Sequence, residues 1–149
     1  MAFVTSRFTT EKNCDDEEFK KQLFPKPYAQ ELLKIANGDL DSAVGLATLS
    51  TGRPENIIFL AQQAVEKYIK AVLVHLQIAF PLVHDLGILI ALLSDDKMPH
   101  EGFALIELNP FATVHRYEKG QIPLTKEEIK ASLESAHRLA QWAMDATKS

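Results

Sequence analysis

Apolar residues recur at spacings of three and four along most of the chain that follows Pro27. This spacing places them on one face of a helix, so it predicts amphipathic α-helices. The first helix is predicted from Pro27 to about Thr51-Gly52, where glycine suits the left-handed residue that often follows a helix. Gly38 lies inside it and marks either a close helix approach or a weak point. Its apolar stripe comprises Ala29, Leu32, Leu33, Ala36, Leu40, Ala43, Val44 and Ala47.

A second helix is predicted to begin at Pro54, because the first helical position makes no use of the N–H that proline lacks. Few polar positions interrupt its apolar face, and Pro81 closes the segment. We therefore expect it to be the central helix of the fold. The face comprises Ile57, Ala61, Ala64, Val65, Tyr68, Ile69, Val72, Leu73 and Leu76.

Two side-chain caps predict where later helices begin. Asp85 is the expected N-cap of a short apolar helix over Leu86 to Leu93. Thr125 and Glu128 match a capping box, in which each side chain satisfies a free backbone N–H of the other residue. The helix that follows has the apolar face Ile129, Leu133, Ala136, Ala140 and Ala143.

Between these two caps, residues 103–114 also have helical spacing, which Pro110 interrupts. No segment alternates apolar and polar residues in the manner of a strand. The predicted fold class is therefore all-α, an antiparallel up-and-down bundle of four to five helices over residues 27–149. Residues 1–26 are mostly polar and are predicted to form an N-terminal arm. This arm is either solvated or docked through Phe19, Leu23 and Phe24.

Composition narrows the possible functions. The chain has 149 residues, a hydrophobic fraction of 46% and a net charge of −4, which are typical of one globular domain. The negative balance argues against nucleic-acid binding through bulk charge, so an anion site would have to be a local patch. The single cysteine, Cys14, excludes an intrachain disulfide.

Several motifs are missing from the sequence. It contains no glycine-rich phosphate loop, no GxSxG turn and no HExxH zinc motif, so we expect neither a metal nor a cofactor. The start of the chain lacks the features of a signal peptide, and no stretch is apolar enough to span a membrane. A cytoplasmic protein is therefore expected.

The predicted central helix carries polar residues on the side away from its apolar face. Gln63, then Glu66 or Lys67, and then Lys70 follow one another at helical spacing, and Glu66 and Lys70 form an i,i+4 pair of the favoured polarity. This stripe is either a solvated helix face or part of a binding site. The second interpretation requires other polar groups to converge on it.

Two further groups are candidates for such a site. His84 and Asp85 open the third predicted helix, where free N–H groups favour an anion. His115, Arg116 and Tyr117 follow the interrupted segment, and arginine can bind phosphate through two hydrogen bonds while tyrosine can stack on a base. Simpler roles stay open: a helix cap for Asp85, a loop carbonyl contact for His84, and a bridge to Glu66 or a carbonyl for Arg116.

Taken together, several blocks of the sequence resemble the HEPN domain family. They are Asn37-Gly-Asp-Leu-Asp-Ser-Ala43, Ala61-Gln-Gln-Ala-Val-Glu-Lys-Tyr-Ile-Lys-Ala71, His84-Asp85-Leu86, Leu108-Asn109 and Arg116-Tyr117. The resemblance implies a helical bundle that commonly dimerises and takes part in nucleotide or RNA chemistry, often beside a small nucleotidyltransferase. It also places His84 and Arg116 across one groove from Lys67 and Lys70.

Many HEPN proteins are metal-independent ribonucleases, whose signature is an arginine followed after four to six residues by a histidine. No arginine of this chain has a histidine in that window. His115 instead precedes Arg116, and adjacent helical residues point about 100° apart. We therefore predict no catalytic residue. The predicted nucleotide- or phosphate-binding residues are Lys67, Lys70, His84, Arg116 and Tyr117, with Gln63, Glu66, Asp85 and His115 as secondary candidates.

The predicted function is that of a non-catalytic HEPN protein. It binds a nucleotide, pairs with a small nucleotidyltransferase, or does both, in a two-component system like a toxin–antitoxin pair. The alternatives are a ribonuclease toxin with an atypical site, using Arg116 with His115 or His84, and a plain dimerisation scaffold. A homodimer is predicted because Trp142 lies off the apolar face of the last helix, and exposed aromatics are enriched at interfaces. The N-terminal arm covering Trp142 is the alternative.

Overall fold

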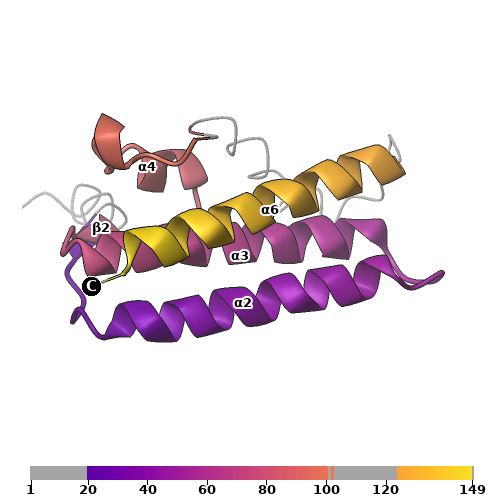
Figure 1. Ribbon diagram of the computed structural model, residues 1–149, viewed down its shortest axis with the longest axis horizontal. Helices are drawn as coiled ribbons and strands as arrows, with labels where there is room; N and C mark the ends of the chain where they lie inside the picture. Colours follow the sequence, from indigo (N-terminus) through magenta and orange to yellow (C-terminus); the bar gives the residue numbers. More distant parts are fainter. Residues whose placement is uncertain (1–19, 101, 103–123, 149) are drawn as a thin grey trace, which may run out of the picture.

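The computed structural model describes residues 20–100, 102 and 124–148. Three long helices dominate this part of the chain: α2 (Tyr28–Ala47), α3 (Pro54–His75) and α6 (Lys126–Ala146). They lie side by side, with α2 running opposite to α3 and α6 (Figure 1). The predicted all-α bundle is confirmed. The helical segment predicted over residues 103–114 lies outside the described residues.

Helix α2 buries most of the stripe that its spacing predicts, but it ends earlier than expected. Its last residue is Ala47, which is exposed, and not Thr51 or Gly52. The hydroxyl of Thr48 donates to the carbonyl of Gly45 at 2.7 Å, and the N–H of Thr48 donates to the same oxygen at 3.1 Å. This local bonding closes the last turn. Gly52 does adopt a positive φ of 98°, in the connection to α3.

Helix α3 begins with Pro54 at its start and is the central helix, as predicted. It packs against α2, against α6 and against the short helix α4 (Leu86–Ile90). Because neighbours surround it, even polar side chains of its middle turns are enclosed: Gln62 is 0% exposed and Glu66 is 3% exposed. Glu66 is therefore enclosed, and the polar stripe is not a fully solvated helix face.

The connection from α3 to α4 carries a small sheet that the sequence analysis did not predict. Strand β2 (Phe80–Pro81) pairs antiparallel with strand β1 (Lys21–Gln22). Beside this pair the ring of Phe24 stacks on Phe80 with 5.2 Å between ring centroids. The last residues of the N-terminal arm therefore dock on the bundle through Phe24, whereas Leu23 is exposed.

Helix α4 begins at the predicted cap and ends three residues early. The carboxylate of Asp85 accepts hydrogen bonds from the N–H groups of Gly87 at 2.8 Å and Ile88 at 3.3 Å. The helix ends at Ile90, and a turn leads into the 3₁₀ helix η1 (Asp95–Lys97). Asp85 thus has the capping role that the sequence left open.

Helix α6 starts at the predicted capping box. The hydroxyl of Thr125 accepts from the N–H of Glu128 at 3.0 Å, and the Glu128 carboxylate accepts from the N–H of Thr125 at 2.9 Å. Leu139, outside the predicted stripe, is fully buried. Trp142 is half-buried against the core, and its indole N–H donates to the carbonyl of Lys97 at 3.3 Å. The prediction of an exposed Trp142 is therefore wrong, and η1 rather than the arm provides its hydrogen-bond partner.

Candidate functional site

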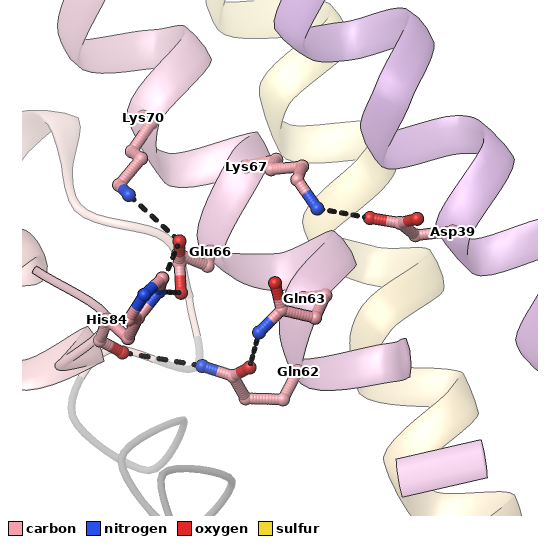
Figure 2. Close-up of polar contacts among 7 residues, drawn as sticks. All are labelled: Asp39, Gln62, Gln63, Glu66, Lys67, Lys70 and His84. Carbon is pink, nitrogen blue, oxygen red and sulfur yellow. Dashed lines mark hydrogen bonds and ion pairs between the residues drawn. The ribbon is translucent and has the colours of Figure 1, made fainter. Parts of the chain in front are cut away.

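A polar cluster lies where the middle of α3 meets the loop that leads into α4 (Figure 2). At its centre the side chain of Glu66 is 4% exposed and accepts a hydrogen bond from Nζ of Lys70 at 2.8 Å. The Nδ1 atom of His84 lies 3.0 and 3.2 Å from the two oxygens of the same carboxylate. One buried carboxylate therefore holds two basic side chains in place.

The contact with Glu66 determines which nitrogen of His84 is available to a ligand. An ionised carboxylate is only an acceptor, so Nδ1 carries the proton in this contact. In a neutral ring the other nitrogen, Nε2, is an acceptor and in a protonated ring it is a donor; in either form it belongs to a side chain that is 68% exposed. The cluster thus presents one imidazole to solvent in a defined orientation.

Two glutamines tie the same loop to α3. Nε2 of the buried Gln62 donates to the backbone carbonyl of His84 at 3.4 Å. Nε2 of Gln63 donates to Oε1 of Gln62 at 2.7 Å. His84 is therefore held through both its ring and its carbonyl oxygen. Gln62 was not among the residues predicted from the sequence, although it lies directly beside Gln63 in the segment Ala61 to Ala71.

Lys67 belongs to a separate ion pair. Its Nζ contacts Oδ2 of Asp39 on α2 at 2.5 Å, and the two side chains are 23% and 24% exposed. Figure 2 shows Lys67 and Lys70 reaching toward different partners. Both lysines of the predicted phosphate patch are thus paired with a carboxylate, so they do not form an uncompensated cationic surface. An anion that binds here must compete with Asp39 and Glu66.

A buried tyrosine next to Lys67 joins the same two helices. Tyr68 is 0% exposed, and its hydroxyl donates to the side-chain oxygen of Asn37 on α2. Burial, with the nearby negative charges of Asp41 and Asp39, raises the pKa of Tyr68 to about 12. At neutral pH this residue is an uncharged hydrogen-bond donor that joins α2 to α3.

The predicted site is therefore only partly assembled by the described residues. Glu66, Lys70, His84 and Gln63 lie in one cluster, while Lys67 lies beside it with Asp39, which was not a predicted site residue. Asp85 caps α4. Arg116, Tyr117 and His115 lie outside the described residues, so their contributions stay predictions. Within the described ranges, no group of three or more His, Cys, Asp or Glu side chains could hold a metal ion.

This protein is a helical bundle with a polar cluster on its central helix. Comparison with models of protein families shows which family it belongs to. The family model of the HEPN domain matches residues 29–146, so the chain belongs to the HEPN domain family. The match includes every residue of the cluster. No curated protein and no solved structure matches the chain. Across the described ranges, each helix is too short or too polar to cross a lipid bilayer.

Proposed function

We propose that this HEPN protein binds a nucleotide, does not cleave RNA, and works with a small nucleotidyltransferase in a two-component system of the toxin–antitoxin kind. The observation that carries nucleotide binding is the exposed imidazole of His84, which the buried Glu66 holds in one orientation. A nucleotide offers both hydrogen-bond donors on its base and sugar and anionic oxygens on its phosphate. The imidazole of His84 suits the hydrogen-bonding groups of the base and sugar. Lys70, which contacts the same carboxylate as His84, suits the phosphate.

The charge balance of the cluster predicts weak binding that salt reduces. Lys67 and Lys70 each have a carboxylate partner, so a bound phosphate would share them with Asp39 and Glu66. By resemblance to the family, Arg116 is expected to supply a further positive charge, and Tyr117 a surface on which a base can stack. Because the protein carries a net charge of −4, long-range attraction contributes little and the local contacts decide affinity.

Isothermal titration calorimetry with a panel of nucleoside mono- and triphosphates tests nucleotide binding. His84→Ala removes the exposed imidazole and should weaken binding about five- to ten-fold, the effect of losing one or two polar contacts. His100→Ala is the matched control, because His100 is an exposed histidine outside the cluster. Absence of binding to every nucleotide, or equal affinities of the two variants, would contradict the proposal.

A ribonuclease is the second candidate, and the contact between Glu66 and His84 is the observation that favours it. When Nδ1 of a neutral ring donates to the carboxylate, Nε2 can accept a proton, as a general base must. Cleavage of RNA also requires an acid for the leaving oxygen and usually a cation at the phosphate. The sequence lacks the Arg and His pair at the family's ribonuclease spacing, so we place this function second. Metal-independent cleavage that requires both His84 and Arg116 would distinguish it.

The nucleotidyltransferase partner is proposed from family membership. Co-expression of this chain with a small nucleotidyltransferase encoded beside its gene, followed by size-exclusion chromatography with light scattering, tests the pairing. Co-elution at the mass of a complex is the expected result. Separate elution of the two proteins at micromolar concentration would contradict the pairing and favour a plain dimerisation scaffold.

A further inference from the structure

A cavity of about 770 Å³ opens at the end of the bundle where α3 and α6 begin. Its described lining comes from the last turn of α2, the connection to α3, the first turn of α3 and the first three turns of α6. This volume is within the range of sites that bind small molecules. None of the cluster residues around Glu66 lines it, so it is a separate feature of the molecule.

The described lining of the cavity has an apolar floor. Ile57 at the start of α3 is buried, and Leu46, Ile129 and Leu133 are half-buried around it. These side chains come from three helices, and they offer a continuous surface to a flat ring or a short hydrocarbon chain. Burial of such a ligand is favourable at about 25 cal/mol for each Å² of apolar surface removed from water.

The rim of the same cavity is positively charged. Lys126 and Lys130 are exposed and stand one turn apart on α6, and neither forms an ion pair with another described residue. Glu134 is the one acidic residue among the described lining residues, while Arg53 also lines the cavity and contacts Glu55 at 3.5 Å. A protein with a net charge of −4 thus gathers positive charge beside an apolar surface.

We propose that this cavity binds a small amphipathic anion, a molecule with an apolar body and one carboxylate or phosphate group. The apolar body lies on Ile57, Ile129 and Leu133, and the anionic group faces Lys126 and Lys130. Side chains four residues apart on a helix are neighbours, so both ammonium groups can reach one anion. The two parts of the cavity therefore match the two parts of such a ligand.

Three probes with the same ring system separate the contributions of the rim and the floor. We expect 2-naphthoate and 2-naphthyl phosphate to bind the full chain in calorimetry and to shift the amide signals of residues 46–57 and 126–137. The neutral 2-naphthylmethanol should bind about ten-fold more weakly, because it cannot pair with the lysines. The relative affinities of the two anions show which anionic group the rim prefers. No binding of either anion, or equal binding of the neutral probe, would overturn the proposal.

Variants of the rim and the floor complete the test. The double variant Lys126→Gln and Lys130→Gln should weaken the binding of both anions about ten-fold. The control double variant Lys34→Gln and Lys97→Gln, which changes two exposed lysines elsewhere, should have no effect on binding. Ala47→Phe places a ring in the cavity from an exposed lining position and should abolish binding. Equal affinities of the two double variants would contradict the role of the rim. Binding of the two naphthyl anions should be unchanged in His84→Ala. The proposal for this cavity and the proposal for nucleotide binding can therefore be refuted independently.

Discussion

The Glu66 carboxylate is almost inaccessible to solvent, and two basic neighbours compensate for the free-energy cost of burying it. Lys70 and His84 both contact its carboxylate, and Lys70 is itself only 13% exposed. A buried ion pair adds little stability by itself, but the loss of one partner leaves the other charge uncompensated. Glu66 is therefore both a structural residue and the residue that positions His84.

Glu66→Ala is predicted to lower the free energy of unfolding by about 2–3 kcal/mol, because it leaves the partly buried Lys70 without a partner. Urea denaturation followed by circular dichroism measures this change. Glu31→Ala is the matched control: its carboxylate contacts Lys34 at 3.5 Å on the exposed side of α2, and its loss should cost less than about 0.5 kcal/mol. Similar losses in the two variants would contradict the role assigned to Glu66.

The raised pKa of Tyr68 predicts a loss of stability in strong base. Below about pH 10 the tyrosine is protonated in both the folded and the unfolded chain. As pH rises toward the folded pKa of about 12, only the unfolded chain ionises, so stability falls by up to about 2–3 kcal/mol. Tyr68→Phe lacks this contribution. The stability advantage of the wild-type chain over Tyr68→Phe should therefore shrink between about pH 10 and pH 12, and a constant difference would contradict the assignment.

The residues of the cluster were only partly predictable from the sequence. The i,i+4 pair of Glu66 and Lys70 and the candidacy of His84 follow from spacing and residue type. The burial of Glu66 and Gln62 does not, because it depends on the loop before α4 packing against α3 from many residues away. Likewise, no local pattern indicates that Lys67 pairs with Asp39 on another helix.

At the scale of the elements, helix starts were predictable because their chemistry is local. Pro54, Asp85 and the pair of Thr125 and Glu128 each act within one turn of chain, and all begin helices as predicted. The two-residue ladder between β1 and β2 joins segments nearly sixty residues apart and has no alternating pattern. The contact of Trp142 with the carbonyl of Lys97 is non-local in the same way.

Gly38→Ala in the interior of α2 is predicted to raise the free energy of unfolding by about 0.5–1 kcal/mol. A Cβ built at Gly38 meets nothing within 4 Å, so alanine would remove backbone freedom from the unfolded chain without a clash. Gly52→Ala is the contrasting variant, because Gly52 has a φ of 98° that alanine adopts only with strain. Urea denaturation of both variants measures these effects. A destabilising Gly38→Ala would show instead that another helix approaches this face.

At the scale of the whole molecule, the homodimer stays a prediction. Trp142 gives no support for a dimer interface, because it packs against the core of its own chain. The prediction now rests on the tendency of HEPN domains to dimerise and on exposed apolar side chains such as Ile35 and Leu82. Light scattering at micromolar concentration should give twice the chain mass of 16.7 kDa. A mass near that of one chain would reject the dimer.

The central claim that this HEPN protein does not cleave RNA is tested most directly by an RNA cleavage assay with a chelator present. Single-stranded RNA is incubated with the purified chain, and fragments are resolved against a buffer control. General acid–base catalysis contributes about 10²–10⁴-fold, so a chain without the paired groups should leave the RNA intact at the background rate. Rapid cleavage that disappears in both His84→Ala and Arg116→Ala, and persists in His100→Ala, would contradict the proposal and establish the ribonuclease.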